Sequence, residues 1–479
     1  MTLFFNLLTT QALLGAFDNL WHHEITERLP AKRSAATEIS LHAARELLYA
    51  VLFLAFAWFE WRGAWAALIL VVMAAEVIIT LIDFIVEDRT RRLPPLERVL
   101  HTLLAINFGI ALAVLAPILL RWLQAPSAIV PVSYGGYSWM FSAFGGAALA
   151  WSIRNTFAAL HHSRPPEWVR SAIVPGKSAN PRNVLIGGAT GFVGSHLVRR
   201  LIARGDTVTV ITRDADRALD RFGPHVRVVT DLNVIDAAAR FDAIVNLAGA
   251  TILGLPWTQH RRSVLVESRV STTRALVNLC ARLERPPAAF VNASAIGYYG
   301  IHDDALLDEE SAPQSIFQSQ LCQRWEEAAL AAEAVCPRVV RLRLGLVLGK
   351  GGGALPALAM PVRLGMGAVL GSGAQWVSWI HIDDLVRLIE FAFDEPSMRG
   401  AVNAVAPHPE THLQFQRVLA RTLHRPMWMR VPAFVVRAGL GEMAQLLLDG
   451  QRVLPKRALA MGFAFQHPDL PEALTQLER

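Results

Sequence analysis

The stretch Asn183-Val-Leu-Ile-Gly-Gly-Ala-Thr-Gly-Phe-Val-Gly-Ser-His-Leu197 decides the fold of the C-terminal half of the chain. An apolar run of strand length leads into Gly188, Gly191 and Gly194, and a helical pattern continues to about residue 204. Glycine allows a tight turn and a close approach of the backbone to a pyrophosphate, which then lies at the positive end of the helix. A second strand at 207–212 completes the context in which such a motif indicates a dinucleotide site.

Further short apolar runs at 226–229, 243–247, 289–293 and 339–344 alternate with helical patterns. Alternating units of this kind predict a doubly wound parallel α/β sheet of the Rossmann type, with its ligand at the C-terminal ends of the strands. The predicted nucleotide contacts lie in the glycine turn and at these strand ends: Gly188, Thr190, Gly191, Phe192, Val193, Gly194, Arg213, Asp231, Leu232, Asn246, Ala248 and Gly249.

Arg213 follows the second strand, where a site that prefers NAD usually has an acidic residue for the ribose hydroxyls. A cation at this position suits the 2′-phosphate of NADP, because guanidinium groups bind phosphate well. The sequence therefore favours NADP as the cofactor. A solvated arginine at the end of a strand is the alternative, and it stays open.

Several motifs in the C-terminal half resemble one known family: Gly-Gly-Ala-Thr-Gly-Phe-Val-Gly (187–194), Asn-Leu-Ala-Gly (246–249), Ser-Arg-Val-Ser-Thr-Thr-Arg (268–274), Ser-Ala-Ile-Gly-Tyr-Tyr-Gly (294–300), Trp-Glu-Glu (325–327), Trp-Ile-His-Ile-Asp-Asp-Leu (379–385) and Gly-Phe-Ala-Phe (462–465). Residues 183 to about 475 resemble the short-chain dehydrogenase/reductase superfamily, in its atypical, epimerase-like branch. The resemblance implies an NADP-binding Rossmann domain with a small C-terminal domain. It also implies an oxidoreductase or epimerase activity on a small-molecule substrate.

The proton-transfer residues of that superfamily are only partly present. Active members use a Tyr-x-x-x-Lys pair on the helix after the fifth strand, together with a serine that holds the substrate oxygen. Ser294 matches the serine, but the segment 317–326 contains neither tyrosine nor lysine. Tyr298 and Tyr299 are the nearest substitutes, so Ser294, Tyr298 and Tyr299 are the catalytic candidates. A packing role for either tyrosine is the alternative.

Two C-terminal segments complete this half. The glycine-rich segment 349–373 predicts a flexible loop over the substrate cleft, with a plain surface loop as the alternative. Residues 409–479 alternate helical patterns with prolines, which predicts a small helical domain. His381, Asp383 and Asp384 are not spaced as metal ligands, and a structural hydrogen-bonding role is expected for them.

The first 162 residues differ in composition from the rest. The whole chain of 479 residues is 53% hydrophobic and only 18% charged, which indicates that part of it lies in lipid. Apolar stretches of near 20 residues, the length that crosses a bilayer, predict an all-α transmembrane bundle of five spans. They occur at 2–21, 42–61, 64–86, 99–121 and 136–158.

The net charge of +6 has a topological explanation, so no nucleic-acid partner is expected. Arginine and lysine concentrate in two loops, 22–41 and 87–98, which predicts that these loops and residues 163–479 are cytoplasmic and that the N-terminus is outside. The protein is thus expected in the inner membrane as a multi-pass protein. The basic residues of these two loops are Arg28, Lys32, Arg33, Arg89, Arg91, Arg92 and Arg98.

The three cysteines of the chain show no Cys-x-x-Cys spacing, so neither a disulfide framework nor a cysteine zinc site is expected.

Acidic residues and histidines within the spans are costly in lipid and tend to face a bundle interior. They form pairs four residues apart, which places each pair on one helical face. The predicted topology brings all of these pairs to the cytoplasmic side, with Glu76 on the same face as Asp83 but two turns deeper. The pairs are Asp18 with His22, His42 with Glu46, Asp83 with Glu87, and Glu97 with His101.

Four interpretations of these residues stay open. Carboxylates and histidines on separate helices suit a dinuclear iron or manganese centre, although the usual Glu-x-x-His spacing differs. His42 and His101 together suit a haem. Interfacial anchoring and a proton or ion pathway are the other two. The candidate metal ligands are His22, His42, Glu46, Glu76, Asp83, Glu87, Glu97 and His101.

The predicted organisation is a transmembrane domain at 1–162, a proline-rich linker at 163–181, a Rossmann domain at 182–408 and a small C-terminal domain at 409–479. The expected function is that of a membrane-anchored NADP-binding oxidoreductase or epimerase with its cleft facing the cytoplasm. The alternatives are a non-catalytic module that senses NADPH and regulates the bundle, and a membrane redox protein fed by NADPH. The sequence identifies no protein partner.

Overall fold

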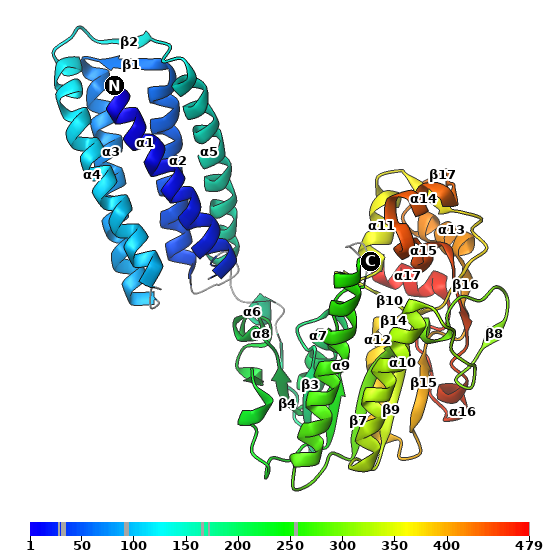
Figure 1. Cartoon of the computed structure of the whole chain (residues 1–479). Helices are drawn as coiled ribbons and strands as arrows, with labels where there is room; N and C mark the ends of the chain where they lie inside the picture. The colour runs from blue at the N-terminus through cyan, green and yellow to red at the C-terminus, as the bar shows by residue number, and fades with distance from the viewer. Residues whose placement is uncertain are drawn as a thin grey trace. The chain divides into compact units, whose positions relative to one another are not determined.

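The computed structural model describes residues 1–26, 29, 35–90, 95–163, 167–170, 173–252 and 257–478. It divides into two compact units, Met1–Pro165 and Pro166–Arg479 (Figure 1). The loop residues Arg28, Lys32, Arg33, Arg91 and Arg92, on which much of the predicted topology rests, lie outside the described residues.

The first unit is a bundle of long helices. Its two short strands pair antiparallel, Phe59 opposite Pro131 and Arg62 opposite Ala128, and they join the helix ends near the N-terminus (Figure 1). The opposite end of the bundle receives the end of the first helix and the start of the second. The elements are α1 (Thr2–Asp18) with a π-helix (Asn19–Thr26), α2 (Ala36–Trp58), β1 (Phe59–Arg62), α3 (Ala64–Thr90), α4 (Pro95–Leu123), β2 (Ala128–Pro131) and α5 (Gly136–Ser163).

Three helices are long and apolar enough to cross a membrane among the residues that the structure describes: Ala36–Trp58, Ala64–Asp88 and Pro95–Leu123. The prediction of five spans is therefore supported for three of them. α1 itself has 17 residues, fewer than the about 20 that cross a bilayer, and the π-helix Asn19–Thr26 continues it. The prediction also began the second span at residue 42, whereas α2 begins at Ala36.

α2 and α5 pack closely at Gly145, where the absence of a side chain leaves room for Leu54 of α2. A Cβ added to Gly145 would lie 2.7 Å from Cγ of Leu54. The Ser152 hydroxyl donates to the Ala43 carbonyl at 2.7 Å, which satisfies a buried donor between the helices. Small residues and side-chain hydrogen bonds of this kind are typical of helices that associate in lipid.

The second unit is built on a seven-stranded sheet in the order β15-β9-β7-β6-β3-β4-β5. Every neighbouring pair in it is parallel, which confirms the predicted doubly wound sheet. The strands are β3 (Asn183–Gly187), β4 (Thr207–Ile211), β5 (Val226–Val229), β6 (Ala243–Asn246), β7 (Ala289–Ala295), β9 (Val339–Leu344) and β15 (Gly400–Ala404).

Alternate residues of β3 supply the two cores on the faces of this sheet. Val184 and Ile186 pack with α7 (Phe192–Arg204) and α12 (Ile382–Asp394). Leu185 belongs to a second core with α9 (Gln259–Arg282). A strand that is covered on both faces is continuously apolar, which explains the run that opens the motif. α8 (Ala215–Phe222) and α10 (Phe317–Leu330) also lie next to the sheet, and α6 (Glu167–Arg170) packs on α8.

The glycine-rich segment 349–373 does not form the predicted flexible loop. It contains short strands and a helix, and the glycines near its start pack on the ring of Phe192. A Cβ at Gly349 would lie 2.5 Å from Cζ of that ring. The backbone can therefore pack against Phe192 only because this position has no side chain. The elements are β10 (Leu346–Gly349), β11 (Gly352–Gly353), α11 (Leu355–Arg363), β12 (Gly367–Leu370) and β13 (Trp376–Val377).

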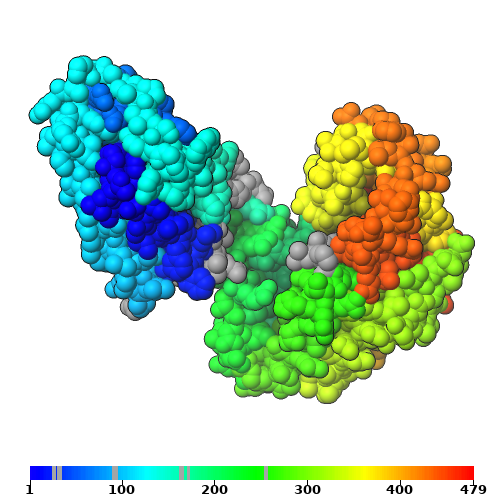
Figure 2. Space-filling view, turned by 45° about the horizontal axis from the view of Figure 1, so that its top comes forward, coloured from blue at the N-terminus to red at the C-terminus, as the bar shows by residue number. Residues whose placement is uncertain are grey.

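The C-terminal residues form a smaller lobe with part of this segment. β12 pairs with β17, and Figure 2 shows the yellow and orange parts of the chain side by side in this lobe. Both helices and short strands contribute to it. Its remaining elements and those beside it are β8 (Leu306–Leu307), β14 (Trp379–His381), β16 (Glu410–Thr411), α13 (His412–Thr422), β17 (Met427–Val431), α14 (Ala433–Leu440), α15 (Gln445–Leu448), β18 (Arg452–Val453), α16 (Lys456–Ala460) and α17 (Leu470–Glu478).

The turn after β3 yields a stability prediction. Gly188 has φ +77°, and a Cβ there would lie 2.6 Å from the carbonyl carbon of Leu247. Gly188→Ala is expected to lower the free energy of unfolding by at least about 2 kcal/mol, because left-handed strain and overpacking add. Thermal unfolding of the detergent-purified chain measures the effect. Gly191→Ala is the control, since Gly191 has φ −74° and its Cβ would meet one atom, at 3.1 Å. Equal stability losses in the two variants would contradict the prediction.

Candidate functional site

The glycine turn places backbone at the C-terminal edge of the sheet. Gly188 lies against the segment that follows β6, and a Cβ on Gly194 would collide with the carbonyl oxygen of Gly188. α7 begins at Phe192 with Gly191 as its N-cap, and no side chain caps that end. An uncapped helix N-terminus behind glycines is suited to an anion such as a pyrophosphate.

The strand-end residues divide into two kinds. Asn246 is buried, donates to Asn292 Oδ1 at 2.7 Å and accepts from the Ala248 backbone N–H at 3.2 Å. It therefore holds the turn rather than pointing outward. Asp231 caps a short turn by accepting from the Asn233 N–H at 2.9 Å. The remaining predicted residues are Thr190, Phe192, Val193 and Leu232, which are partly buried, and Gly249, which is exposed.

Cations gather beside the glycine turn. Arg213 is exposed after β4 and makes no hydrogen bond or ion pair with the described residues. Arg221 on α8 donates to the carbonyl of Thr190 at 2.5 Å. Burial lowers the pKa of Arg221, and the charge of Arg199 adds to this. The sequence does not single out Arg221, because this residue lies within α8 and not directly after a strand.

Residues that the sequence assigns to a linker pack on this region. Glu167 of α6 forms ion pairs with Arg199 and, at 3.3 Å, with Arg221. The Gly176 N–H donates to the Ile202 carbonyl at 3.0 Å. Contacts to the Rossmann fold thus begin before residue 182.

Ser294 lies at the end of β7 and is buried. Its hydroxyl donates to Glu326 Oε1 at 2.8 Å, so it points to α10. Glu326 also accepts from Arg343 Nε at 2.8 Å and from Arg341 Nη1 at 3.0 Å. Two arginines and one serine share this carboxylate, which therefore compensates charge inside the fold.

The two tyrosines occupy different environments. Tyr299 is fully buried, donates to Asn403 Oδ1 at 2.6 Å and accepts from Arg343 Nη1 at 3.0 Å. Burial raises the pKa of Tyr299 to about 12, so it stays protonated at neutral pH. Tyr298 is partly exposed, with the Arg343 guanidinium 3.5 Å from its ring centroid. The structure thus gives Tyr299 the packing role and leaves Tyr298 as the accessible candidate.

His381 also has a structural environment. Its Nδ1 accepts from the Asp383 N–H at 3.2 Å, and its Nε2 lies 2.9 Å from Gln476 Oε1. Both ring nitrogens are therefore occupied. Asp384 accepts from the Gln466 and His467 backbone N–H groups, each at 2.8 Å.

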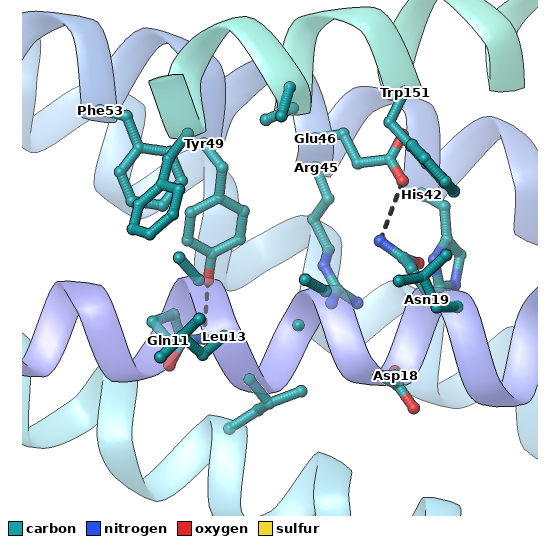
Figure 3. A pocket seen from close by; sticks show the side chains of 18 residues that line it. Gln11, Leu13, Asp18, Asn19, His42, Arg45, Glu46, Tyr49, Phe53 and Trp151 are labelled. Atoms are coloured by element: carbon teal, nitrogen blue, oxygen red, sulfur yellow. Dashed lines mark hydrogen bonds between the residues drawn. The ribbon is translucent and has the colours of Figure 1, made fainter. Parts of the chain in front are cut away.

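A second candidate site lies in the bundle, where a cavity of about 240 Å³ opens between α1, α2 and α5. Figure 3 shows Arg45, Glu46 and Tyr49 extending from α2 toward α1. Dashed lines mark the bonds from Asn19 to Glu46 at 3.2 Å and from Gln11 to Tyr49 at 2.9 Å. The remaining lining is mainly apolar, with Asp18 and His42 at one end.

Buried acids and histidines converge at this end of the bundle. Asp18, His23, Glu97 and His101 present side-chain atoms that all lie within 4.8 Å of one another. His101 Nε2 is 3.1 Å from Asp18 Oδ2, and His23 Nε2 is 3.4 Å from Glu97 Oε1. They come from α1, the π-helix that extends it, and α4.

A second group adjoins the first. His23, Glu38, His42 and Glu87 also present atoms within 4.8 Å of one another, so His23 belongs to both groups. The rings of His23 and His42 have centroids 4.4 Å apart. The sequence reasoning missed His23 and Glu38. A π-helix brings residues five apart onto one face, which pairs Asp18 with His23, and Glu38 lies in a helical turn that was assigned to a loop.

Four other candidate ligands lie outside the two groups. His22 Nδ1 is bonded to Asp18 Oδ1 at 2.7 Å. Glu46 accepts from Asn155 at 3.0 Å, and Glu76 accepts from Tyr49 at 2.9 Å. Asp83 belongs to neither group but is adjacent, with Oδ2 2.7 Å from Arg45 Nη1 and 3.2 Å from His42 Nε2. These four residues surround the groups rather than complete them.

The parallel sheet with its glycine turn defines the second unit as a Rossmann-like fold of the nucleotide-binding class. Family models match residues 184–404 as the NAD dependent epimerase/dehydratase family and residues 431–477 as a domain of unknown function (DUF1731). The epimerase family protein YfhF of Bacillus subtilis is 35% identical over 297 residues, which cover 62% of this chain and 97% of the relative. The chain belongs to this epimerase family.

Solved structures agree with this assignment. The human epimerase family protein SDR39U1 (isoform 2), crystallised with NADPH, is 36% identical with a TM-score of 0.56, and the match covers 62% of this chain and 98% of that chain. A nucleoside-diphosphate sugar epimerase from Corynebacterium glutamicum is 25% identical with a TM-score of 0.51, over 73% of this chain and 67% of that chain.

The buried network around Glu326 yields a second stability prediction. Glu326→Ala leaves the Arg343 guanidinium buried without its carboxylate, so the free energy of unfolding is expected to fall by about 3 to 5 kcal/mol. Thermal unfolding of the full chain measures this. The neighbouring exposed Glu327→Ala is the control and is expected to change stability by no more than about 0.5 kcal/mol. A loss below about 1 kcal/mol in Glu326→Ala would show that the network does not compensate buried charge.

Proposed function

We propose that this protein is a membrane-anchored oxidoreductase or epimerase that binds NADP(H) and acts on a small-molecule substrate. The observation that carries the proposal is the turn from Gly188 to Gly194, where side chains would collide with backbone. Glycine in those positions keeps the backbone open to a pyrophosphate at the start of α7. The NADPH-bound human relative supports the same ligand class.

The choice of NADP over NAD rests on Arg213. It is exposed, makes no ion pair with the described residues, and follows β4 beside the glycine turn. A free guanidinium in this position is available to a 2′-phosphate, whereas Arg199 and Arg221 are held by Glu167. When bound, NADPH supplies a hydride.

The chain's own contribution to catalysis is restricted by the contacts of Ser294 and Tyr299. Ser294 donates to Glu326 and Tyr299 donates to Asn403, so neither group is directed at a substrate in this conformation. This observation favours a second candidate function, in which the domain binds NADPH as a sensor without turnover. Incubation with NADPH and cell metabolites separates the two, because a sensor does not consume the nucleotide.

The membrane assignment is also part of the proposal. Three apolar helices support it, and α1 and α5 are proposed to span with them as the first and fifth helices. The N-terminus is then outside, and the second unit is in the cytoplasm of a cell whose inner membrane holds the bundle. The lipid bilayer is thereby a partner of the protein.

Cofactor selectivity tests the proposed function. The full chain in detergent is expected to bind NADPH more tightly than NADH in a fluorescence titration. Arg213→Ala is expected to weaken NADPH binding by about 10- to 100-fold and to leave NADH binding unchanged, because one charge-assisted contact is lost. Arg227→Ala, an exposed arginine on β5, is the matched control. Equal affinity for both nucleotides in the wild type would refute the assignment of NADP.

Topology is tested separately. A fluorescent reporter that matures only in the cytoplasm is fused after Ser163 or after the last residue, and both fusions are expected to fluoresce. The reason is the excess of basic residues in loops 22–41 and 87–98. A periplasm-specific phosphatase at the same points is expected to be inactive. The opposite pattern would place the second unit outside.

A further inference from the structure

The two adjoining groups in the bundle have the composition of a metal centre. Three histidines and four carboxylates contribute, and imidazole with carboxylate oxygen is the donor set that iron and manganese bind well. Ligands at roughly 2.1 Å from one ion lie no more than about 4.2 Å apart. The separations within 4.8 Å in each group are close to that limit.

Two ring nitrogens support a ligand-binding role independently of the clustering. His23 and His42 are each only 5% exposed, and Nε2 of both makes no hydrogen bond within the described part of the chain. His23 Nε2 nevertheless has Glu97 Oε1 at 3.4 Å and Asp18 Oδ2 at 3.8 Å. A buried nitrogen aimed at carboxylate oxygens without hydrogen-bond geometry suits a shared ion between them.

We propose that the bundle holds two neighbouring first-row transition-metal ions, iron or manganese. Asp18, Glu97 and His101 hold one ion, and Glu38, His42 and Glu87 hold the other. His23 lies between them and contacts either. Divalent ions add positive charge beside the four carboxylates, which lowers the cost of burying ionised carboxylates at membrane depth.

The surrounding bonds orient the ligands as metal sites require. Metal-bound histidines commonly donate their second N–H to a carboxylate. Nδ1 of His101 is 3.3 Å from Glu87 Oε2, and Glu87 Oε1 is 3.6 Å from His42 Nε2, so this carboxylate connects the two groups. The same contacts place Glu87 between His42 and His101. The macrocycle of a haem bound by both histidines would have to occupy that space, so the arrangement disfavours a haem.

The site has an open side. Asp18 and His42, one from each group, line the mainly apolar cavity of about 240 Å³. A metal centre that reacts keeps a coordination position open, whereas a structural one is closed. Through this cavity, a small apolar molecule could reach the open coordination position.

Metal content of the full chain tests the proposal. The detergent-purified protein is incubated without oxygen with iron(II) or manganese(II), desalted and analysed for metals. About two ions per chain are expected. Glu97→Gln and His101→Ala are expected to retain less than half of this amount. Glu76→Gln is the matched control, a buried carboxylate of the same bundle outside both groups, and is expected to retain about two ions.

Folding of the variants is followed by NADPH binding and by the melting temperature. Metal is expected to raise the melting temperature of the wild type and of Glu76→Gln but not that of Glu97→Gln, because binding to the folded state stabilises it. Wild-type protein with less than one tenth of an ion per chain after loading would overturn the proposal. So would a Soret absorption band, or metal retained in full by both ligand variants. Loss of NADPH binding alone would leave the metal result standing, since the two sites use different residues.

Discussion

Charge that is buried away from water has to be compensated inside the protein, and this constraint governs both units. In the second unit, Glu326 accepts hydrogen bonds from two arginines and from Ser294, and Arg343 is only 3% exposed. In the bundle, carboxylates from four helices lie beside three histidines. In both arrangements, the removal of one partner leaves the desolvation cost of the other uncompensated.

The same constraint shapes the local structure of the bundle. α1 continues as a π-helix at Asn19–Thr26, and such segments are frequent at functional sites. Its wider turn carries His23 to the acids while His22 bonds Asp18 from the neighbouring position. Glu46 and Glu76, by contrast, accept hydrogen bonds from the neutral side chains of Asn155 and Tyr49. Charge compensation thus separates the residues that form the cluster from those that support the bundle.

Local rules were sufficient to predict the parallel sheet and the glycine turn from the sequence. A strand, a glycine spacing and a helix occupy one continuous stretch, so position 188 could be assigned without tertiary information. The position of His23 in the cluster could not be predicted, because α-helical periodicity pairs Asp18 with His22 and no sequence pattern indicates a π-helix. The glycine content after 349 predicts a flexible loop, yet Gly349, Gly352 and Gly353 pack on Phe192, which lies far away in the sequence. Ser294 was recognised, but its partner Glu326 is 32 residues distant.

Crystallography at an absorption edge tests most directly whether the converging acids and histidines hold two metal ions. Crystals of the full chain loaded with manganese are measured above and below the manganese edge. The account predicts two anomalous peaks, one beside Asp18, Glu97 and His101 and one beside Glu38, His42 and Glu87. A map without peaks, in which these carboxylates bond only protonated histidines or arginines, would contradict it.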